Sequence, residues 1–263
     1  MRNHKIVFKY LKYKIFASHK RGHGIHSPFV FSLITEVFRN KIDPDIVCNI
    51  EKLRKKMLAD QSLVNVTDYG AGSKHIKDKL RKVSSIARYS SVPAKYGKLL
   101  ANLAGRYGGT DIVELGTSLG ISTLYLSKGS ASSTVHTIEG CPVLSDIAGN
   151  YFREAGCSNI KSYTGKFDEV LSELKNRNIV PGLVFIDGDH RRDALLRYFD
   201  LVAGMCNDKS VVVIDDIHSS AEMFETWEEI KNLKNVTVTI DIFRLGIVFF
   251  RKGIAKSDYV IRY

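Results

Sequence analysis

Cysteine is scarce in this chain, and long apolar runs are missing. No two of the four cysteines have the spacing of a zinc site or a redox pair; they are Cys48, Cys141, Cys157 and Cys206. We therefore expect free thiols and a reducing compartment. The longest apolar runs, such as Val211–Ile214, have the length of a strand, far short of the roughly 20 residues of a membrane-spanning helix.

The N-terminal segment lacks the apolar core of a secretion signal. Lysines interrupt it at four places, namely Lys5, Lys9, Lys12 and Lys14. These absences favour a cytoplasmic protein. Met1–Ser18 still mixes aromatic and aliphatic residues with lysines, which fits either contact with an anionic membrane surface or an ordinary packed helix.

Acidic residues are few in the first part of the chain. Residues 1–110 hold 22 Lys and Arg against 7 Asp and Glu, whereas residues 111–263 hold 17 against 21. The basic part could face nucleic acid, anionic lipid or an acidic substrate, or it could be a solvated lysine-rich surface. No aromatic-interleaved RNA-binding motif accompanies the charge.

Strand and helix signals alternate from residue 111 onward, which predicts βαβ units and a mostly parallel sheet. The expected strands are 111–115, 134–138, 160–163, 183–186, 210–214, 236–243 and 247–251, and the expected helices are 122–127, 143–155, 167–176, 192–205 and 221–231. The last two strands flank Arg244-Leu245-Gly246 and predict a closing hairpin with one antiparallel strand at or near an edge. The fold class is therefore α/β, a doubly wound seven-stranded sheet.

A glycine-rich turn follows the first of these strands. Glu114–Gly120 has the pattern E-x-G-x-x-x-G, which differs from the G-x-G-x-x-G fingerprint of dinucleotide-binding proteins. The glycines allow a tight turn and close approach of a ligand. Glu139 ends the next strand, 19 residues beyond Gly120, and a carboxylate there can accept both hydroxyls of a ribose.

On these residues the chain resembles the class I S-adenosylmethionine-dependent methyltransferases, and among them the small O-methyltransferases related to catechol O-methyltransferase. The resemblance covers about residues 85–252. It implies that Gly116–Gly120 contacts the methionine part of S-adenosylmethionine, that Glu139 holds the ribose, and that Gly165-Lys166-Phe167 meets the adenine. The cofactor-binding residues implied in this way are Glu114, Gly116, Thr117, Ser118, Gly120, Ser122, Glu139, Lys166, Phe167 and Asp187.

Carboxylates follow the next two strands of the expected sheet. Asp187 comes directly after one strand, and Asp215 and Asp216 come after its neighbour. Because the carboxyl ends of parallel strands meet in one crevice, we expect these acids to crowd together. A divalent cation such as Mg²⁺ would relieve their repulsion, since it prefers oxygen ligands.

The resemblance adds roles for these residues. Metal-dependent relatives bind their cation with acids at the positions of Asp187, Asp215 and Asp216, and the metal lowers the pKa of the substrate hydroxyl. The metal-dependent relatives carry a lysine base at the position where this chain has His190. A histidine can act as a base near neutral pH, so we take His190 as the first candidate base and His218 as the second, with Asp187 beside them. Two plainer roles stay open, a helix cap for His190 and a surface loop for His218.

The front of the chain holds further motifs. We expect helices at 29–39, 46–58 and 93–107, with Pro28 opening the first, so that residues 1–84 form a basic, mainly helical extension or lid over a methyltransferase domain at 85–263. His23 and His26 either line the substrate pocket or belong to an ordinary turn. Asp68–Ser73 looks like a second glycine motif, but no strand ending in an acid follows it, and we interpret it as a loop.

These observations favour O-methylation of a small-molecule hydroxyl, with or without a divalent metal. An RNA methyltransferase is an alternative that only the basic front half supports, because the chain has neither adjacent prolines nor a Pro-Cys pair, the marks of common base-methylating enzymes. A non-catalytic S-adenosylmethionine-binding protein and a nicotinamide-dependent oxidoreductase are further alternatives. Whether the protein is a homodimer is left open.

Overall fold

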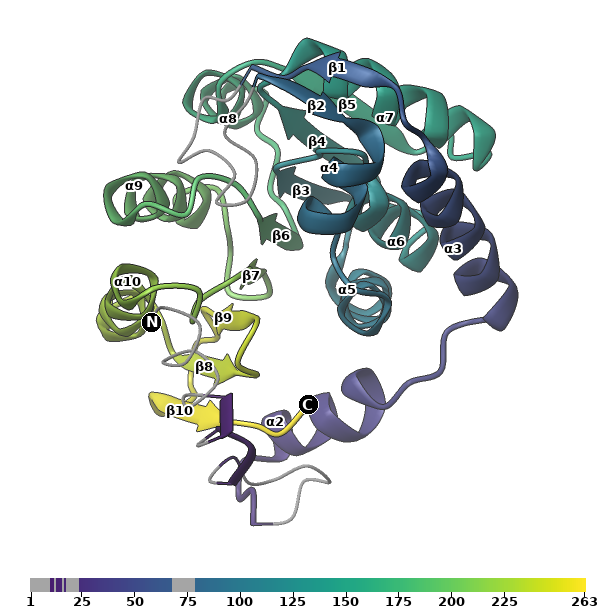
Figure 1. Cartoon of the computed structure of the whole chain (residues 1–263). Helices are drawn as coiled ribbons and strands as arrows, with labels where there is room; N and C mark the ends of the chain where they lie inside the picture. The colour runs from purple at the N-terminus through teal and green to yellow at the C-terminus, as the bar shows by residue number, and fades with distance from the viewer. Residues whose placement is uncertain (1–9, 12, 16, 18–23, 68–78) are drawn as a thin grey trace.

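The computed structural model describes residues 10–263 except 12, 16, 18–23 and 68–78. Its centre is an eight-stranded sheet with the strand order β10-β8-β9-β7-β6-β3-β4-β5, and helices cover both faces (Figure 1). The strands are β3 (Asp111–Leu115), β4 (Thr134–Glu139), β5 (Ile160–Thr164), β6 (Leu183–Ile186), β7 (Val211–Ile214), β8 (Val238–Asp241), β9 (Gly246–Phe249) and β10 (Ser257–Val260). The doubly wound α/β class is thereby confirmed.

The sheet has one strand more than the sequence analysis expected. The strands β3 to β7 are parallel, and β9 runs antiparallel to both of its neighbours, β7 and β8, as the closing hairpin requires. The eighth strand, β10, lies parallel to β8 at the edge. Its sequence alternates half-buried and exposed residues, so it lacks the apolar run that marked the interior strands.

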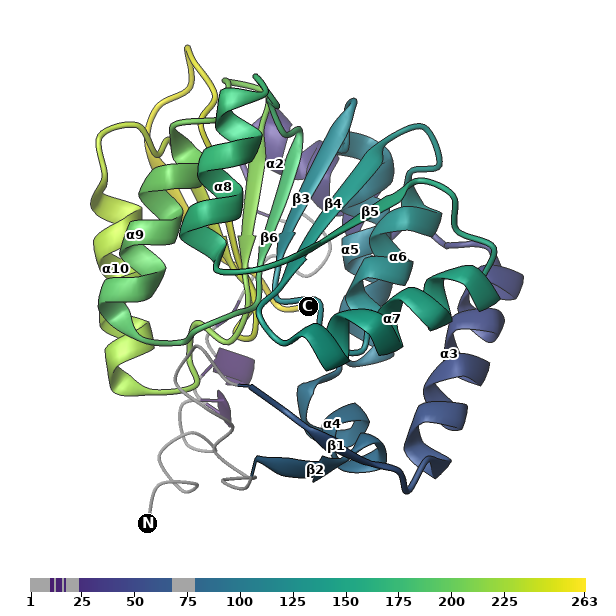
Figure 2. The same cartoon turned by 90° about the horizontal axis from the view of Figure 1, so that it is seen from above.

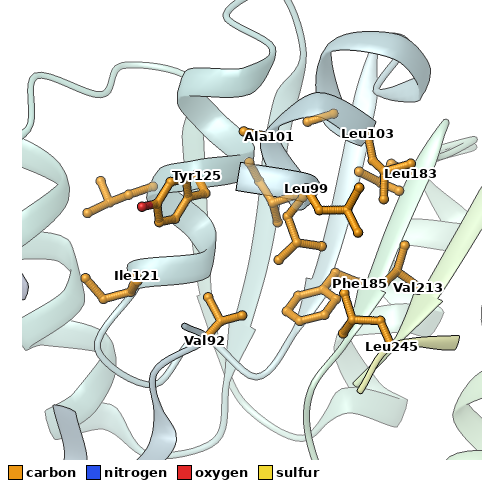
Figure 3. Close-up of a cluster of buried hydrophobic side chains, with 14 of the residues drawn as sticks. Val92, Leu99, Ala101, Leu103, Ile121, Tyr125, Leu183, Phe185, Val213 and Leu245 are labelled. Atoms are coloured by element: carbon orange, nitrogen blue, oxygen red, sulfur yellow. The ribbon is translucent and has the colours of Figure 1, made fainter. Parts of the chain in front are cut away.

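Alternate residues of the central strands supply two separate cores. Val113 and Leu115 face the helices α8 (Phe167–Asn176), α9 (Arg192–Ala203) and α10 (Ala221–Asn232), whereas Ile112 between them faces the other side. That second side is covered by α5 (Ala94–Tyr107), α6 (Ile121–Gly129) and α7 (Pro142–Glu154). Figure 3 shows this core, in which Phe185 of β6 lies between Leu99 of α5 and Leu245.

The N-terminal part contributes to the same core. Its helices are α2 (Pro28–Ser32), which continues into the π-helix η1 (Leu33–Phe38), and α3 (Pro44–Ala59), and the helices expected there are present. The segment Leu63–Val66, a possible strand from its sequence, contains β1 (Leu63–Asn65); its antiparallel partner β2 (Leu80–Lys82) and helix α4 (Val83–Ser90) were not expected. The boundary drawn after residue 84 falls inside α4, and the division into two domains stays a prediction.

Two parts of the N-terminal region reach the carboxyl ends of the parallel strands. The Tyr10 ring contacts that of Phe243, which follows β8, at a centroid distance of 5.0 Å. The Thr67 backbone N–H donates to Sγ of Cys141, just after β4, at 3.4 Å. Figure 2 shows β1, β2 and α4 together at this end of the sheet.

Several predicted features fall outside the described residues. These are His23, the second glycine motif at Asp68–Ser73 and most of Met1–Ser18. In the part of the chain that the structure describes, no helix is both long enough and apolar enough to cross a bilayer.

Candidate active site

The register of the sheet sets three predicted site residues side by side. Leu115, Ile186 and Ile214 are neighbours across β3, β6 and β7, and each ends its strand. The next residues, Gly116, Asp187 and Asp215, therefore leave the sheet together. The backbone N–H of Asp187 donates to the Leu115 carbonyl at 2.9 Å, and that of Asp215 donates to Ile186 at 2.9 Å. The crevice expected from the sequence is thereby formed.

The turn after β3 needs glycine at both of its ends. Gly116 has φ +102°, and a Cβ there would lie 2.5 Å from the carbonyl oxygen of Asp187. Gly120 has φ +84°, and a Cβ there would lie 2.4 Å from the Phe152 ring. A side chain at either position would strain the left-handed backbone and would clash with these neighbouring atoms. The loop consequently brings its bare backbone into contact with the strand end that carries Asp187.

Glu114 lies buried directly beneath this loop. The hydroxyls of Thr123 and Thr137 donate to its Oε2 at 2.5 and 2.6 Å. Its Oε1 has no partner at hydrogen-bonding geometry among the described residues, although the Ser122 hydroxyl lies nearby. Burial raises the pKa of this carboxyl to about 7, against the effect of the three hydroxyls. A buried acceptor with a vacant lone pair fits an ammonium group such as that of a bound methionine.

Glu139 holds the other side of the loop. Its Oε2 accepts the backbone N–H of Ser118 at 2.8 Å, and its Oε1 accepts that of Cys141 at 2.9 Å. These bonds fix the carboxylate at the end of β4, directly beside the glycine loop. Thr117, between the two acids, shares a 2.5 Å hydrogen bond with Thr137.

The segment after β5 reaches the same region. The N–H of Gly165 donates to the Glu139 carbonyl at 3.0 Å, so Lys166 and Phe167 begin beside that acid. The Phe167 ring packs so closely on Gly188 that a Cβ there would lie 2.5 Å from it. Lys166 is largely exposed and pairs only loosely with Glu169, at 3.4 Å. The structure thus places Phe167 between the ends of β5 and β6, where a planar ligand could stack.

The acid cluster contains a cation that the sequence analysis missed. The Arg244 guanidinium donates to both oxygens of Asp215, from Nε at 2.8 Å and from Nη2 at 2.6 Å. Asp215 is fully buried, and Asp216 lies 3.9 Å from the same Nη2. Arg244 stands two residues before Gly246, which pairs with Ile214 at the end of β7. The contact between Arg244 and Asp215 follows from the register of β9 against β7. The sequence alone shows only an arginine in a turn.

The predicted metal ligands do not fit a divalent cation in this arrangement. Arg244 occupies both oxygens of Asp215, which would be the central ligand. The described part of the chain has no group of three Asp, Glu, His or Cys side chains placed to hold a metal. Burial and the neighbouring Asp215 raise the pKa of the Asp187 carboxyl well above its usual range.

His190 faces the acid cluster. Its Nε2 lies 3.9 Å from Oδ1 of Asp187, beyond a hydrogen bond but within an ion-pair distance, and 27% of its side chain is exposed. Helix α9 is preceded by Arg191 at the N-cap, and no side chain bonds to that cap, so His190 does not cap the helix. An accessible imidazole beside a buried acid suits a general base.

His218 has a different environment. Its Nε2 bonds to Oδ2 of Asp241 at 2.7 Å, and its ring stacks between Phe224 and Phe243 at centroid distances of 5.1 and 4.8 Å. Its Nδ1 is buried and lacks a hydrogen-bond partner within the described ranges. The surface-loop alternative is therefore wrong. Because neither nitrogen is accessible, a substrate proton could reach His218 only after a rearrangement.

The structure does not bring His26 to this site. His26 is exposed and precedes Phe29 by three residues. Phe29 packs against Phe249 at a centroid distance of 5.0 Å. Phe249 pairs with Val211 at the start of β7, which is the opposite end of that strand from Asp215. For His26, the turn before a helix is the better description.

Aromatic side chains surround the outer side of Arg244. Its guanidinium lies over the Tyr96 ring at 5.7 Å, and that ring contacts Tyr263 at 5.9 Å. Phe243, the preceding residue, contacts both Tyr10 and Tyr13 of the N-terminal part. None of these was singled out in the sequence, because they come from four separate segments.

The pKa of Glu114 predicts a specific dependence of stability on pH. Its folded-state pKa of about 7 exceeds the usual value of 4.5, so the folded protein retains a proton that the unfolded chain loses between these values. The free energy of unfolding should therefore fall as pH rises from about 4.5 to about 7, by roughly 3 kcal/mol from this group. Glu114→Gln should remove that share. Urea unfolding of both proteins at pH 5 and pH 7.5 measures it, and an equal drop in the two proteins would refute the assignment.

Comparison with known proteins agrees with the geometry. Residues 113–217 match the family model described as a methyltransferase domain. A Mycolicibacterium smegmatis protein, named provisionally as an O-methyltransferase, is 37% identical over 102 residues, 38% of this chain and 48% of its own length. The catechol O-methyltransferase of Mycobacterium tuberculosis is 28% identical over 129 residues, 48% of this chain and 57% of its own length. The chain spans about half the length of these curated relatives.

A solved structure shows the same fold over most of the chain. The O-methyltransferase from Bacillus cereus, crystallised with S-adenosylhomocysteine, superposes with a TM-score of 0.56 at 15% identity, covering 90% of this chain and 99% of the other. At that identity the likeness concerns the fold. The central segment of the chain is therefore similar in sequence to methyltransferase domains, and most of the chain shares the fold of a solved O-methyltransferase.

Proposed function

We propose that this protein transfers a methyl group from S-adenosylmethionine to a hydroxyl of a small molecule. The observation that carries the proposal is the contact between the glycine loop and the strand end of Asp187. This contact supports a cofactor site bounded by Glu114 and Glu139, which would lie directly beside the polar crevice that holds His190. The relatives' names supply the reaction class.

The residues fit the cofactor at three points. The vacant Oε1 of Glu114 would accept its ammonium group, the glycine backbone would pass under its methionine part, and Glu139 would hold its ribose. Phe167 and Lys166 would lie at the adenine. When bound, S-adenosylmethionine supplies a methyl group already activated on a sulfonium, so the protein's task is alignment and exclusion of water.

On the acceptor side we assign His190 as the base. It would take the proton of the acceptor hydroxyl on its imidazole while the oxygen forms a bond to the methyl carbon and the carbon–sulfur bond breaks. Asp187, 3.9 Å away, would orient the imidazolium that results. Tyr10 and Phe243, the residue before Arg244 in the chain, have their rings in contact and would give the crevice an apolar wall that suits a flat or apolar acceptor, and the N-terminal extension would act as its cover.

The divalent metal implied by the family resemblance remains a prediction that the residues do not favour, since Arg244 occupies Asp215. An RNA substrate rests only on the basic front half, and no contact of the described residues adds support. The test is transfer of a labelled methyl group to a panel of phenols and catechols, with RNA as the competing acceptor. Labelled small-molecule product supports the proposal, whereas salt-sensitive labelling of RNA alone contradicts it.

A further inference from the structure

A single arginine from the closing hairpin balances the acid cluster at the ends of β6 and β7. Three carboxylates meet there, from Asp187, Asp215 and Asp216, and Arg244 is the cation that contacts them most closely among the described residues. Both of its bonds to Asp215 run in parallel, the planar pairing that guanidinium and carboxylate groups favour.

Several contacts hold this guanidinium in place. Asp215 is completely buried and cannot turn toward solvent, while 27% of the Arg244 side chain remains exposed. The Tyr96 ring lies on one side of the guanidinium at 5.7 Å. The backbone also favours the position, because the Ile217 N–H donates to the Arg244 carbonyl at 3.2 Å and ties the hairpin turn to the loop after β7.

We infer that Arg244 occupies the position of a divalent cation and supplies, from the chain itself, the positive charge that orients the acceptor oxygen. The guanidinium can do this because two of its five N–H donors are used on Asp215 and its exposed edge has others left. It cannot make room for a metal without giving up both of its hydrogen bonds to the buried Asp215 carboxylate. The role of Arg244 in orienting the acceptor rests on the proposed function. Its occupancy of the cation position does not depend on that function.

Arg244 would thus be a positioning residue with a measurable consequence besides turnover. A cation and Mg²⁺ or Mn²⁺ repel each other, so the wild-type protein should bind Mn²⁺ no better than an ordinary acidic surface does. Arg244→Gln removes the positive charge and releases both oxygens of Asp215, so the three carboxylates can regroup around a cation, and Mn²⁺ should bind at least about tenfold more tightly than in the wild type. The Arg197→Gln variant is the matched control, since Arg197 pairs on the surface with Asp168.

The experiment is titration of Mn²⁺ into the wild type and the variants, followed by electron paramagnetic resonance of free Mn²⁺, with circular dichroism as the check on folding. A new site in Arg244→Gln that disappears in the Arg244→Gln, Asp215→Asn double variant supports the inference. Absence of any gain in a folded Arg244→Gln overturns it. If that variant does not fold, the wild type decides: one micromolar Mn²⁺ site lost on Asp215→Asn overturns the inference, and no such site supports it.

Titration of S-adenosylhomocysteine into the same samples separates the two hypotheses. Cofactor binding that is unchanged in Arg244→Gln, together with the gained Mn²⁺ site, supports both. Loss of cofactor binding in every protein, with the Mn²⁺ result intact, would overturn the proposed function and leave the cation assignment standing.

Discussion

Replacing His190 with glutamine should lower kcat for the favoured acceptor by a factor of about 10² to 10⁴, the range that a positioned general base contributes. The affinity for S-adenosylhomocysteine should stay within about twofold, because His190 lies on the acceptor side of the crevice. His190 is the accessible histidine of the site, with its Nε2 facing Asp187 at 3.9 Å. Single-turnover kinetics at saturating cofactor measures the effect directly.

Two histidine variants serve as comparisons for that measurement. His26→Gln changes an exposed histidine near the opposite end of the strands and should leave kcat unaltered. His218→Gln removes the partner of Asp241 from between two rings and should lower the melting temperature, with a loss in kcat below about tenfold. A larger kcat loss in His218→Gln than in His190→Gln would show that the base has been assigned to the wrong residue.

Replacing Glu139 with alanine should raise the Kd for S-adenosylhomocysteine by about 100-fold. Two hydrogen bonds from a ribose to a carboxylate are worth about 3 kcal/mol together, which corresponds to that factor. The variant also leaves the N–H groups of Ser118 and Cys141 without their acceptor, so the loop loses its support. Isothermal titration provides the Kd.

The control for Glu139 is Glu173→Ala, which removes an exposed carboxylate that pairs with Arg177 on the surface of α8. It should bind S-adenosylhomocysteine like the wild type. Affinity retained within about threefold in Glu139→Ala would mean that the ribose lies elsewhere, whatever the melting temperature of the variant.

The sequence was sufficient for the parts of the site that depend on position along a strand. An apolar run in the sequence indicates a buried strand, and the residue that follows the run lies at the carboxyl end of that strand. Asp187 and Asp215 were predicted in this way, and the structure brings both to the expected edge. Glu139 is the last residue of β4, whereas Glu114 lies one residue inside the end of β3.

Contacts between distant segments were beyond that reasoning. Arg244 meets Asp215 because β9 pairs antiparallel with β7 in one particular register, and a shift by one residue would turn the arginine away. The edge strand β10 escaped notice because a strand buried on one side only shows no apolar run. A metal was predicted because the sequence shows the three acids together but does not show that Arg244 lies among them.

All the roles proposed for these residues depend on the identity of the cofactor. Isothermal titration of the purified protein with S-adenosylhomocysteine and separately with NADH, each with and without Mg²⁺, tests this most directly. We predict micromolar binding of S-adenosylhomocysteine that Mg²⁺ does not change, and no binding of NADH. Binding of NADH without S-adenosylhomocysteine would contradict the roles given to Glu114, Glu139 and the glycine loop between them.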